Sequence, residues 1–139
     1  MTTSNPQVTA DQPRIVKHTA YDAFIEKEGI PNITGFAVAD LRTVEVKPWA
    51  RLDCLGTYIN LDGAGKTNDS YVAEIPPGGK MAPEKHIFEK NILVLEGRGA
   101  TSVGDDPNSR VSFEWKRGSV FSIPINVWHQ HMNGSGTEP

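Results

Sequence analysis

Cysteine is almost absent from this chain of 139 residues, since Cys54 is its one thiol. No disulfide can form within the chain, which excludes the disulfide-stapled class of small secreted domains and favours a reducing compartment. Cys54 stands between Leu52 and Leu55, and this apolar setting predicts a small core residue in preference to a nucleophile.

Long apolar runs and an excess of basic residues are also missing. No segment approaches the ~20 apolar residues that cross a bilayer, and residues 1–13 lack the basic and apolar regions of a signal peptide. The formal net charge is −3 and the pI is near 5.8, so no electrostatic footprint for nucleic acid or an anionic membrane is expected. We therefore predict a cytoplasmic protein.

Turn-forming residues are abundant, with 13 Gly and 10 Pro. Residues 18–28 carry the best helical pattern, which Gly29 and Pro31 should end. After residue 41 the pattern changes to short apolar runs separated by Gly, Pro, Asp or Asn, which is typical of an all-β sandwich or barrel. The strands are expected over residues 43–46, 55–61, 71–75, 91–95, 111–115, 120–123 and 127–132. The chain thus divides into an N-terminal arm and short helix (1–40) and a β-domain (41–139).

Histidines are the most informative polar residues. His18 falls on the expected helix, whereas His86, His129 and His131 fall in or beside expected strands. Alternation along a strand puts Glu84 with His86 on one face and His129 with His131 on another. If both faces look into one barrel, imidazole nitrogens and a carboxylate converge as they do around divalent Fe, Mn, Ni or Zn. The other interpretation is a small pocket of polar residues satisfied by hydrogen bonds.

Two stretches of the chain resemble the two sequence motifs of the cupin superfamily. Residues 78–97 read GGKMAPEKHIFEKNILVLEG and resemble G-x5-H-x-H-x3-E-x6-G, and residues 118–133 read GSVFSIPINVWHQHMN and resemble G-x5-P-x-G-x2-H-x3-N. The residues in register are Gly78, His86, Gly97, Gly118, Pro124, His129 and Asn133. The resemblance implies a cupin-type jelly-roll β-barrel, here preceded by the short helix.

The resemblance also implies which residues would hold a metal, and the chain departs from the family at three positions. By register the ligand roles fall to Glu84, His86, Lys90 and His129, with Glu84 in place of a histidine and Lys90 in place of a glutamate. Asn126 stands for the glycine of the second motif, a mild change because Asn tolerates left-handed backbone. A protonated lysine cannot ligate a metal and its charge opposes a cation nearby.

Two arrangements could reconcile Lys90 with a working pocket. His131 could complete a metal set of Glu84, His86, His129 and His131. Alternatively Lys90 could pair with Glu84, and the pocket would then hold an anionic small molecule without a metal.

We expect a metal-binding cupin that acts on a small oxygen-rich or acidic metabolite, as a dioxygenase, isomerase or decarboxylase. In that enzyme Lys90 would be catalytic, fixing a substrate carboxylate or transferring a proton if burial lowers its pKa. The rival hypothesis is a non-catalytic small-molecule-binding barrel with a degenerate metal site.

The C-terminus suggests a third hypothesis, because the chain stops soon after the second motif, where a jelly roll needs another strand. We therefore expect either that the chain is half of a longer bicupin, or that the N-terminal segment or a second subunit completes the sheet. A homodimer is expected, with no nucleic-acid or membrane partner.

Overall fold

The structure is a computed structural model that describes residues 19–64, 67–106 and 108–139. One α-helix and nine strands follow each other along the described residues. They are α1 (Ala20–Glu28), β1 (Asn32–Gly35), β2 (Lys47–Trp49), β3 (Cys54–Leu61), β4 (Ser70–Glu74), β5 (Lys90–Leu93), β6 (Arg98–Val103), β7 (Val111–Lys116), β8 (Val120–Ile123) and β9 (His129–Asn133). His18, placed on the expected helix, lies outside the described residues.

Helix α1 is delimited by the chemistry of its two ends. Thr19 is the N-cap and forms a capping box with Asp22, which satisfies backbone N–H groups that the first turn leaves without partners. Gly29 ends the helix in left-handed conformation at φ 70°. The predicted helix and its glycine stop are therefore confirmed.

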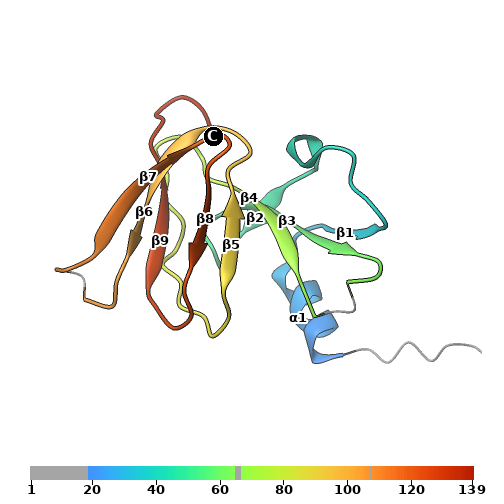
Figure 1. Cartoon of the computed structure of the whole chain (residues 1–139). Coiled ribbons are helices and arrows are strands. Elements are labelled where there is room, and N and C mark those ends of the chain that lie inside the picture. The colour runs from blue at the N-terminus through green and yellow to red at the C-terminus, as the bar shows by residue number, and fades with distance from the viewer. Residues whose placement is uncertain (1–18, 65–66, 107) are drawn as a thin grey trace, which may run out of the picture.

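The N-terminal half of the structure is a four-stranded sheet built around β3. Strand β4 pairs antiparallel with one edge of β3. The other edge is shared, since β2 pairs antiparallel with its first residues and β1 pairs parallel with its last ones. In Figure 1 this sheet and α1 lie together on one side of the molecule, and strands β5 to β9 lie on the other side.

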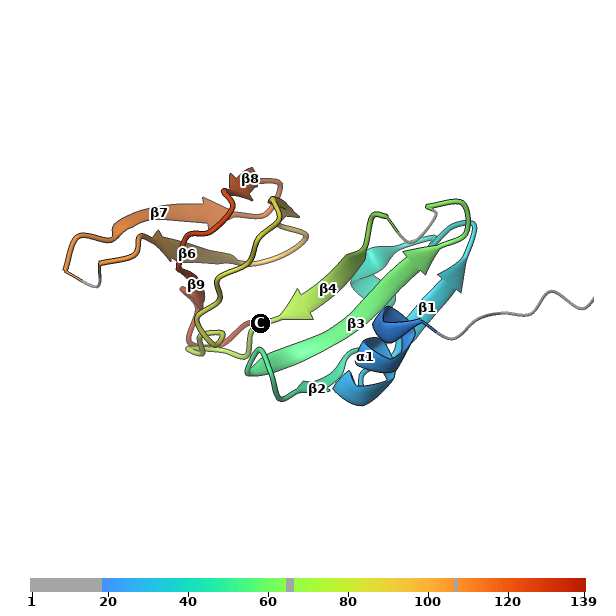
Figure 2. The same cartoon turned by 90° about the horizontal axis from the view of Figure 1, so that it is seen from below.

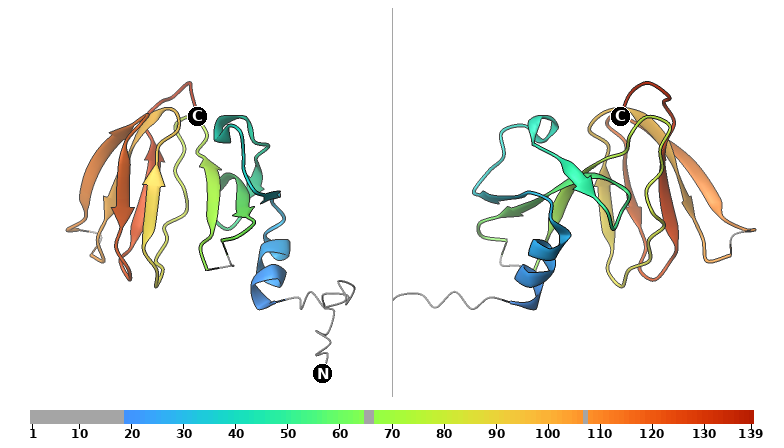
Figure 3. Two further views of the ribbon diagram at one scale, coloured as in Figure 1. Left: turned by 45° about the vertical axis from the view of Figure 1, so that its right-hand side comes forward. Right: turned by 180° about the vertical axis from the view of Figure 1, so that it is seen from behind.

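The C-terminal half contains two further sheets, β5–β8 and β7–β6–β9. Figure 2 shows strands β6 to β9 grouped apart from β1 to β4, and Figure 3 shows the same two groups from two other sides. The segment after β4 joins the groups, because it lies beside β9 through bridges at Lys80–Met132 and Glu84–His129. It also reaches the first sheet, where the Ala82 N–H donates to the Leu52 carbonyl over 2.8 Å.

The main apolar core joins α1, the first sheet and the segment after β4. Its buried members are Ile25, Ile30, Trp49, Leu52, Cys54, Tyr58 and Met81. Trp49 packs edge-on against Tyr58 and Tyr71, with ring centroids 5.2 and 5.0 Å away. Cys54 is buried here, and burial raises the pKa of its thiol to about 12, so the thiol is an inert core group.

The expected all-β architecture with one short helix is confirmed. Strands β3, β4, β5, β7, β8 and β9 overlap the expected ones. The expected strand over residues 43–46 is wrong: Leu41–Thr43 form a 3-10 turn capped by Asp40, and the extended residues come later, in β2. Strands β1, β2 and β6 were not among the expected ones.

Gly99 on β6 offers a direct test of the packing between β6 and its neighbours. A Cβ at this position would lie 2.1 Å from the Met132 carbonyl oxygen and 2.4 Å from the Trp115 ring. Because the first of these atoms is backbone, we expect Gly99→Ala to lower the free energy of unfolding by about 3 kcal/mol. Urea denaturation measures it, with Gly136→Ala as control because no atom lies within 4 Å of that Cβ. Equal losses of unfolding free energy in the two variants would contradict the close packing of β6 against its neighbouring strands.

Candidate functional site

The two motif segments meet because the chain after β4 runs along β9. Glu84 and His129 exchange both backbone hydrogen bonds, each 2.9 Å long. Their side chains consequently lie on the same side of this pairing, with 3.9 Å between the Glu84 Oε1 and His129 Nε2 atoms. The sequence placed these residues 45 positions apart, and the antiparallel pairing brings them together.

His86 joins this pair through the loops at the end of β8. Its carbonyl accepts a 2.7 Å hydrogen bond from the Asn126 N–H, and Asn126 is held at φ 57°. The left-handed conformation expected at the motif glycine is therefore found on an asparagine. The His86 ring stacks on Phe88, with centroids 4.3 Å apart, and lies 5.0 Å from the His129 ring.

His131 is the third imidazole of the cluster, at 5.3 Å from the His129 ring. Its Nδ1 is 2.8 Å from the Thr101 hydroxyl, which accepts a hydrogen bond from the Trp115 indole N–H over 2.9 Å. Burial, with smaller effects from His129 and Lys90, lowers the pKa of His131 to about 3. His131 is therefore neutral and its ring is held by Thr101.

The protons of His86 and His129 can be assigned from their partners. The Nδ1 of His86 lies 2.5 Å from the Phe88 carbonyl and the Nδ1 of His129 lies 3.3 Å from the Val127 carbonyl. A carbonyl only accepts, so each Nδ1 must carry the proton and each Nε2 must present a lone pair when the ring is neutral. Burial lowers the pKa of His129, with Lys90 acting in the same direction.

Both Nε2 atoms are buried and have no hydrogen-bond partner. Leaving a buried acceptor unsatisfied costs about 1–3 kcal/mol. Two such atoms in one cluster are a feature that packing alone does not explain.

Lys90, the first residue of β5, points into this cluster. Its Nζ donates to the Glu84 Oε1 over 3.0 Å and lies 5.4 Å above the Tyr71 ring. The side chain is only 10% exposed, and burial lowers the pKa of its ammonium although Glu84 opposes this effect. Of the two arrangements expected for Lys90, the structure has the one in which it pairs with Glu84.

Arg51 extends the charged part of the site and was missed from the sequence. Its Nη1 lies 3.9 Å from the second oxygen of Glu84, while its Nε donates to Glu28 over 2.7 Å. Nothing in the sequence indicated this role, because Arg51 lies outside both motif segments. Thr101, which holds His131, was missed for the same reason.

Comparisons with known proteins place the C-terminal half of the chain in a family. The family model described as "Cupin domain" matches residues 71–139, which contain both motif segments and every residue of the histidine cluster. The chain belongs to the cupin superfamily. No curated protein matches this cupin.

A solved structure described as the cupin domain of Cnp3 from Schizosaccharomyces pombe is similar to this cupin. The TM-score is 0.56 at 16% sequence identity, over 70% of this chain and 64% of the other. The chain thus spans less than two thirds of that structure. At this identity the likeness shows a shared fold.

The donor set of this cupin fits a metal in part. The two free Nε2 lone pairs suit a divalent transition metal, whereas the oxygen of Glu84 nearest to His129 is bonded to Lys90. Within the described ranges, no group of three or more His, Cys, Asp or Glu side chains is arranged to hold a metal ion. Two imidazoles are therefore prepared, and a third ligand requires Lys90 to release Glu84.

In the described part of this cupin no helix is both long and apolar enough to traverse a bilayer.

Proposed function

We propose that this cupin binds a divalent transition metal (Fe, Mn, Ni or Zn) through the Nε2 atoms of His86 and His129, with Glu84 as third ligand. The observation that carries the proposal is the pair of buried Nε2 atoms without partners. Their Nδ1 protons are held by carbonyls, the outer-shell arrangement that directs an imidazole lone pair toward a metal.

The proposal assigns Lys90 a role in both states of the site. Without metal its ammonium neutralises Glu84 from 3.0 Å away. When Lys90 releases Glu84, the same ammonium is placed to hold the carboxylate of an acidic substrate. A bound metal would supply Lewis acidity or, if it were iron, the activation of dioxygen. We propose on this basis an enzyme acting on a small oxygen-rich or acidic metabolite, with Lys90 as its catalytic residue.

His131 has a supporting part in this proposal. When its Nδ1–H donates to the Thr101 hydroxyl, its Nε2 keeps a lone pair and would join His86, His129 and Glu84 as a fourth ligand. Thr101, which is itself held by the Trp115 indole, fixes the orientation of this ring.

A non-catalytic cupin that binds an anionic small molecule without metal is the second candidate. The hydrogen bond between Lys90 and Glu84 favours it, because a buried ammonium close to a potential metal position repels a cation. In this case Lys90 would exchange Glu84 for the ligand carboxylate.

Cytoplasmic location and homodimer formation belong to the same proposal. Analytical ultracentrifugation measures the association. The bicupin hypothesis is supported if a longer reading frame encodes a second pair of motifs downstream.

Metal content tests the first candidate directly. We expect about one equivalent of a transition metal per untagged chain after incubation with Fe, Mn, Ni or Zn. His86→Ala should lower the metal affinity by about 100-fold, because even the loss of an outer-shell partner of a ligand lowers affinity by about 10- to 100-fold. His86 is only partly buried, which limits the structural damage. Elemental mass spectrometry and competition titration give both quantities.

The matched control is Lys85→Ala, the neighbouring residue whose ammonium pairs with Asp105 at the surface over 3.1 Å. Surface pairs of this kind contribute little to stability, so this variant should keep its metal. If the parent takes up none of the four metals, the metal-binding proposal fails and the anion-binding candidate takes its place.

A further inference from the structure

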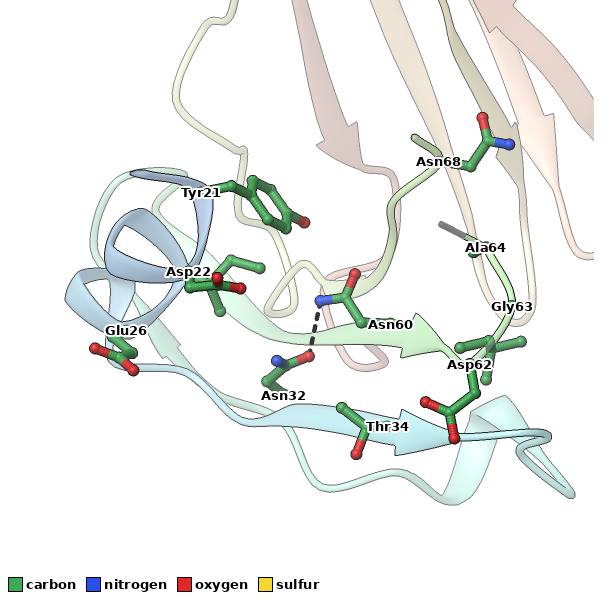
Figure 4. A pocket seen from close by; sticks show the side chains of 12 residues that line it. Tyr21, Asp22, Glu26, Asn32, Thr34, Asn60, Asp62, Gly63, Ala64 and Asn68 are labelled. Atoms are coloured by element: carbon green, nitrogen blue, oxygen red, sulfur yellow. Dashed lines mark hydrogen bonds between the residues drawn. The ribbon is translucent and has the colours of Figure 1, made fainter. Parts of the chain in front are cut away.

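A second site is formed by a cavity of about 570 Å³ between α1 and the ends of β1 and β3. Figure 4 shows this cavity with the helix on one side and the two strands on the other. Its lining shares no residue with the histidine cluster. Any function of this cavity is therefore separate from the proposed metal site.

Neutral polar side chains from the two paired strands form one wall. Asn32 and Thr34 come from β1, and Asn60 comes from β3, where it is the register partner of Thr34. The Asn60 Nδ2 donates to the Asn32 Oδ1 over 2.8 Å. The Asn32 Nδ2 and the Asn60 Oδ1 take no part in this bond, so the pair presents a donor and an acceptor side by side.

Tyr21 of α1 stands across from these amides (Figure 4). Its hydroxyl oxygen is buried, and Asn60 and Asp69 are its polar neighbours. Burial, with Asp69 acting in the same direction, holds the pKa of this phenol well above its ordinary value. Tyr21 therefore retains its proton and can donate it to a ligand oxygen.

The charge of the cavity narrows the ligand class. Asp22, Glu26 and Asp62 contribute carboxylates to the lining, which disfavours anions. A metal ion is also disfavoured, because no three carboxylate, imidazole or thiol groups among the described residues are gathered around one point. Ile25 and the ring of Tyr21 add apolar surface. A ligand with alternating hydroxyl groups and a face of C–H groups complements this combination of polar and apolar surface.

We propose that this cavity binds a neutral polyhydroxylated molecule of the size of a mono- or disaccharide, through Asn32, Asn60 and Tyr21. The volume falls within the range of about 300–1,000 Å³ that is usual for small-molecule sites. The carboxylate of Asp62 accepts from ligand hydroxyls, and the Tyr21 ring packs against the sugar face.

The experiment is an NMR titration of the ¹⁵N-labelled full chain with glucose, maltose and myo-inositol, with spermidine and citrate as charged comparators. We expect at least one of the three polyols to shift the side-chain amide signals of Asn32 and Asn60, with a dissociation constant of about 1 mM. Tyr21→Phe removes one oxygen and keeps the ring, so it should weaken binding by about fivefold, and Asn60→Ala by about tenfold. Asn91→Ala, on an exposed position of β5, should change nothing.

The same spectra show whether each variant is folded, and Tyr21→Phe tests the site if Asn60→Ala is not. The proposal is overturned if none of the polyols shifts these signals, if spermidine alone does, or if the shifts fall around His86 and His129. Metal content is independent of all these results, so failure here leaves the proposed function standing.

Discussion

Lys90→Glu is expected to increase the affinity of this cupin for Ni²⁺ or Zn²⁺ by at least about 100-fold. The substitution removes an ammonium that bonds to Glu84 over 3.0 Å and puts a carboxylate at the position where the cupin motif has one. At an effective dielectric constant of about 20, two unit charges 4 Å apart interact by ~4 kcal/mol, and ~1.4 kcal/mol corresponds to a factor of ten. Isothermal titration with a competing chelator measures the change.

Two control variants separate the causes of this effect. Lys90→Gln removes the charge without adding a ligand, and it should give a smaller gain than Lys90→Glu. Lys116→Glu makes the same change of net charge at an exposed position of β7, and it should leave metal affinity unchanged. Affinity that does not rise in Lys90→Glu would falsify the view that His86 and His129 are prepared as ligands.

Trp49→Ala is expected to lower the free energy of unfolding by about 3–5 kcal/mol, the range for removing a large buried aromatic side chain. Trp49 is 1% exposed, packs against Tyr58 and Tyr71, and donates its indole N–H to Glu28. The cavity left behind and the loss of a donor to Glu28 act in the same direction.

Trp128→Ala is the matched control, because Trp128 is 39% exposed and its loss should cost less than about 1 kcal/mol. Urea denaturation of the two variants measures the difference. Similar losses from both would show that the core does not centre on Trp49. Tyr71 also packs beneath Lys90, so Trp49→Ala should in addition weaken ligand binding at the histidine cluster.

The sequence predicted a strand best where turn-forming residues mark both of its ends. Strand β8 was predicted with its bounds, since Val120 follows a glycine turn and Ile123 precedes a proline. Strand β1 was missed because its four residues, NITG, have no apolar alternation. It is extended because β3 offers an unpaired edge, which local sequence does not reveal. The alternation in residues 43–46 misled because Asp40 caps a 3-10 turn just before it.

The candidate site was predictable as a set of positions but not as an arrangement. Glu84, His86, Lys90 and His129 follow from the spacing of the two motifs, and the pairing of residues 79–84 with β9 brings the segments together. Arg51 enters the same network from the turn between β2 and β3. A side chain so far from both motifs can only be placed once the sheets are packed.

By itself the sequence determined the class of fold, the helix stop at Gly29 and the positions that could hold a ligand, because these depend on local spacing and turn chemistry. Only the tertiary structure decided that Lys90 turns inward to Glu84 and that the Nε2 atoms of His86 and His129 have no partner. The physical reason is that residues from other strands set the orientation and protonation of a side chain, and these residues come close to it only when the chain folds.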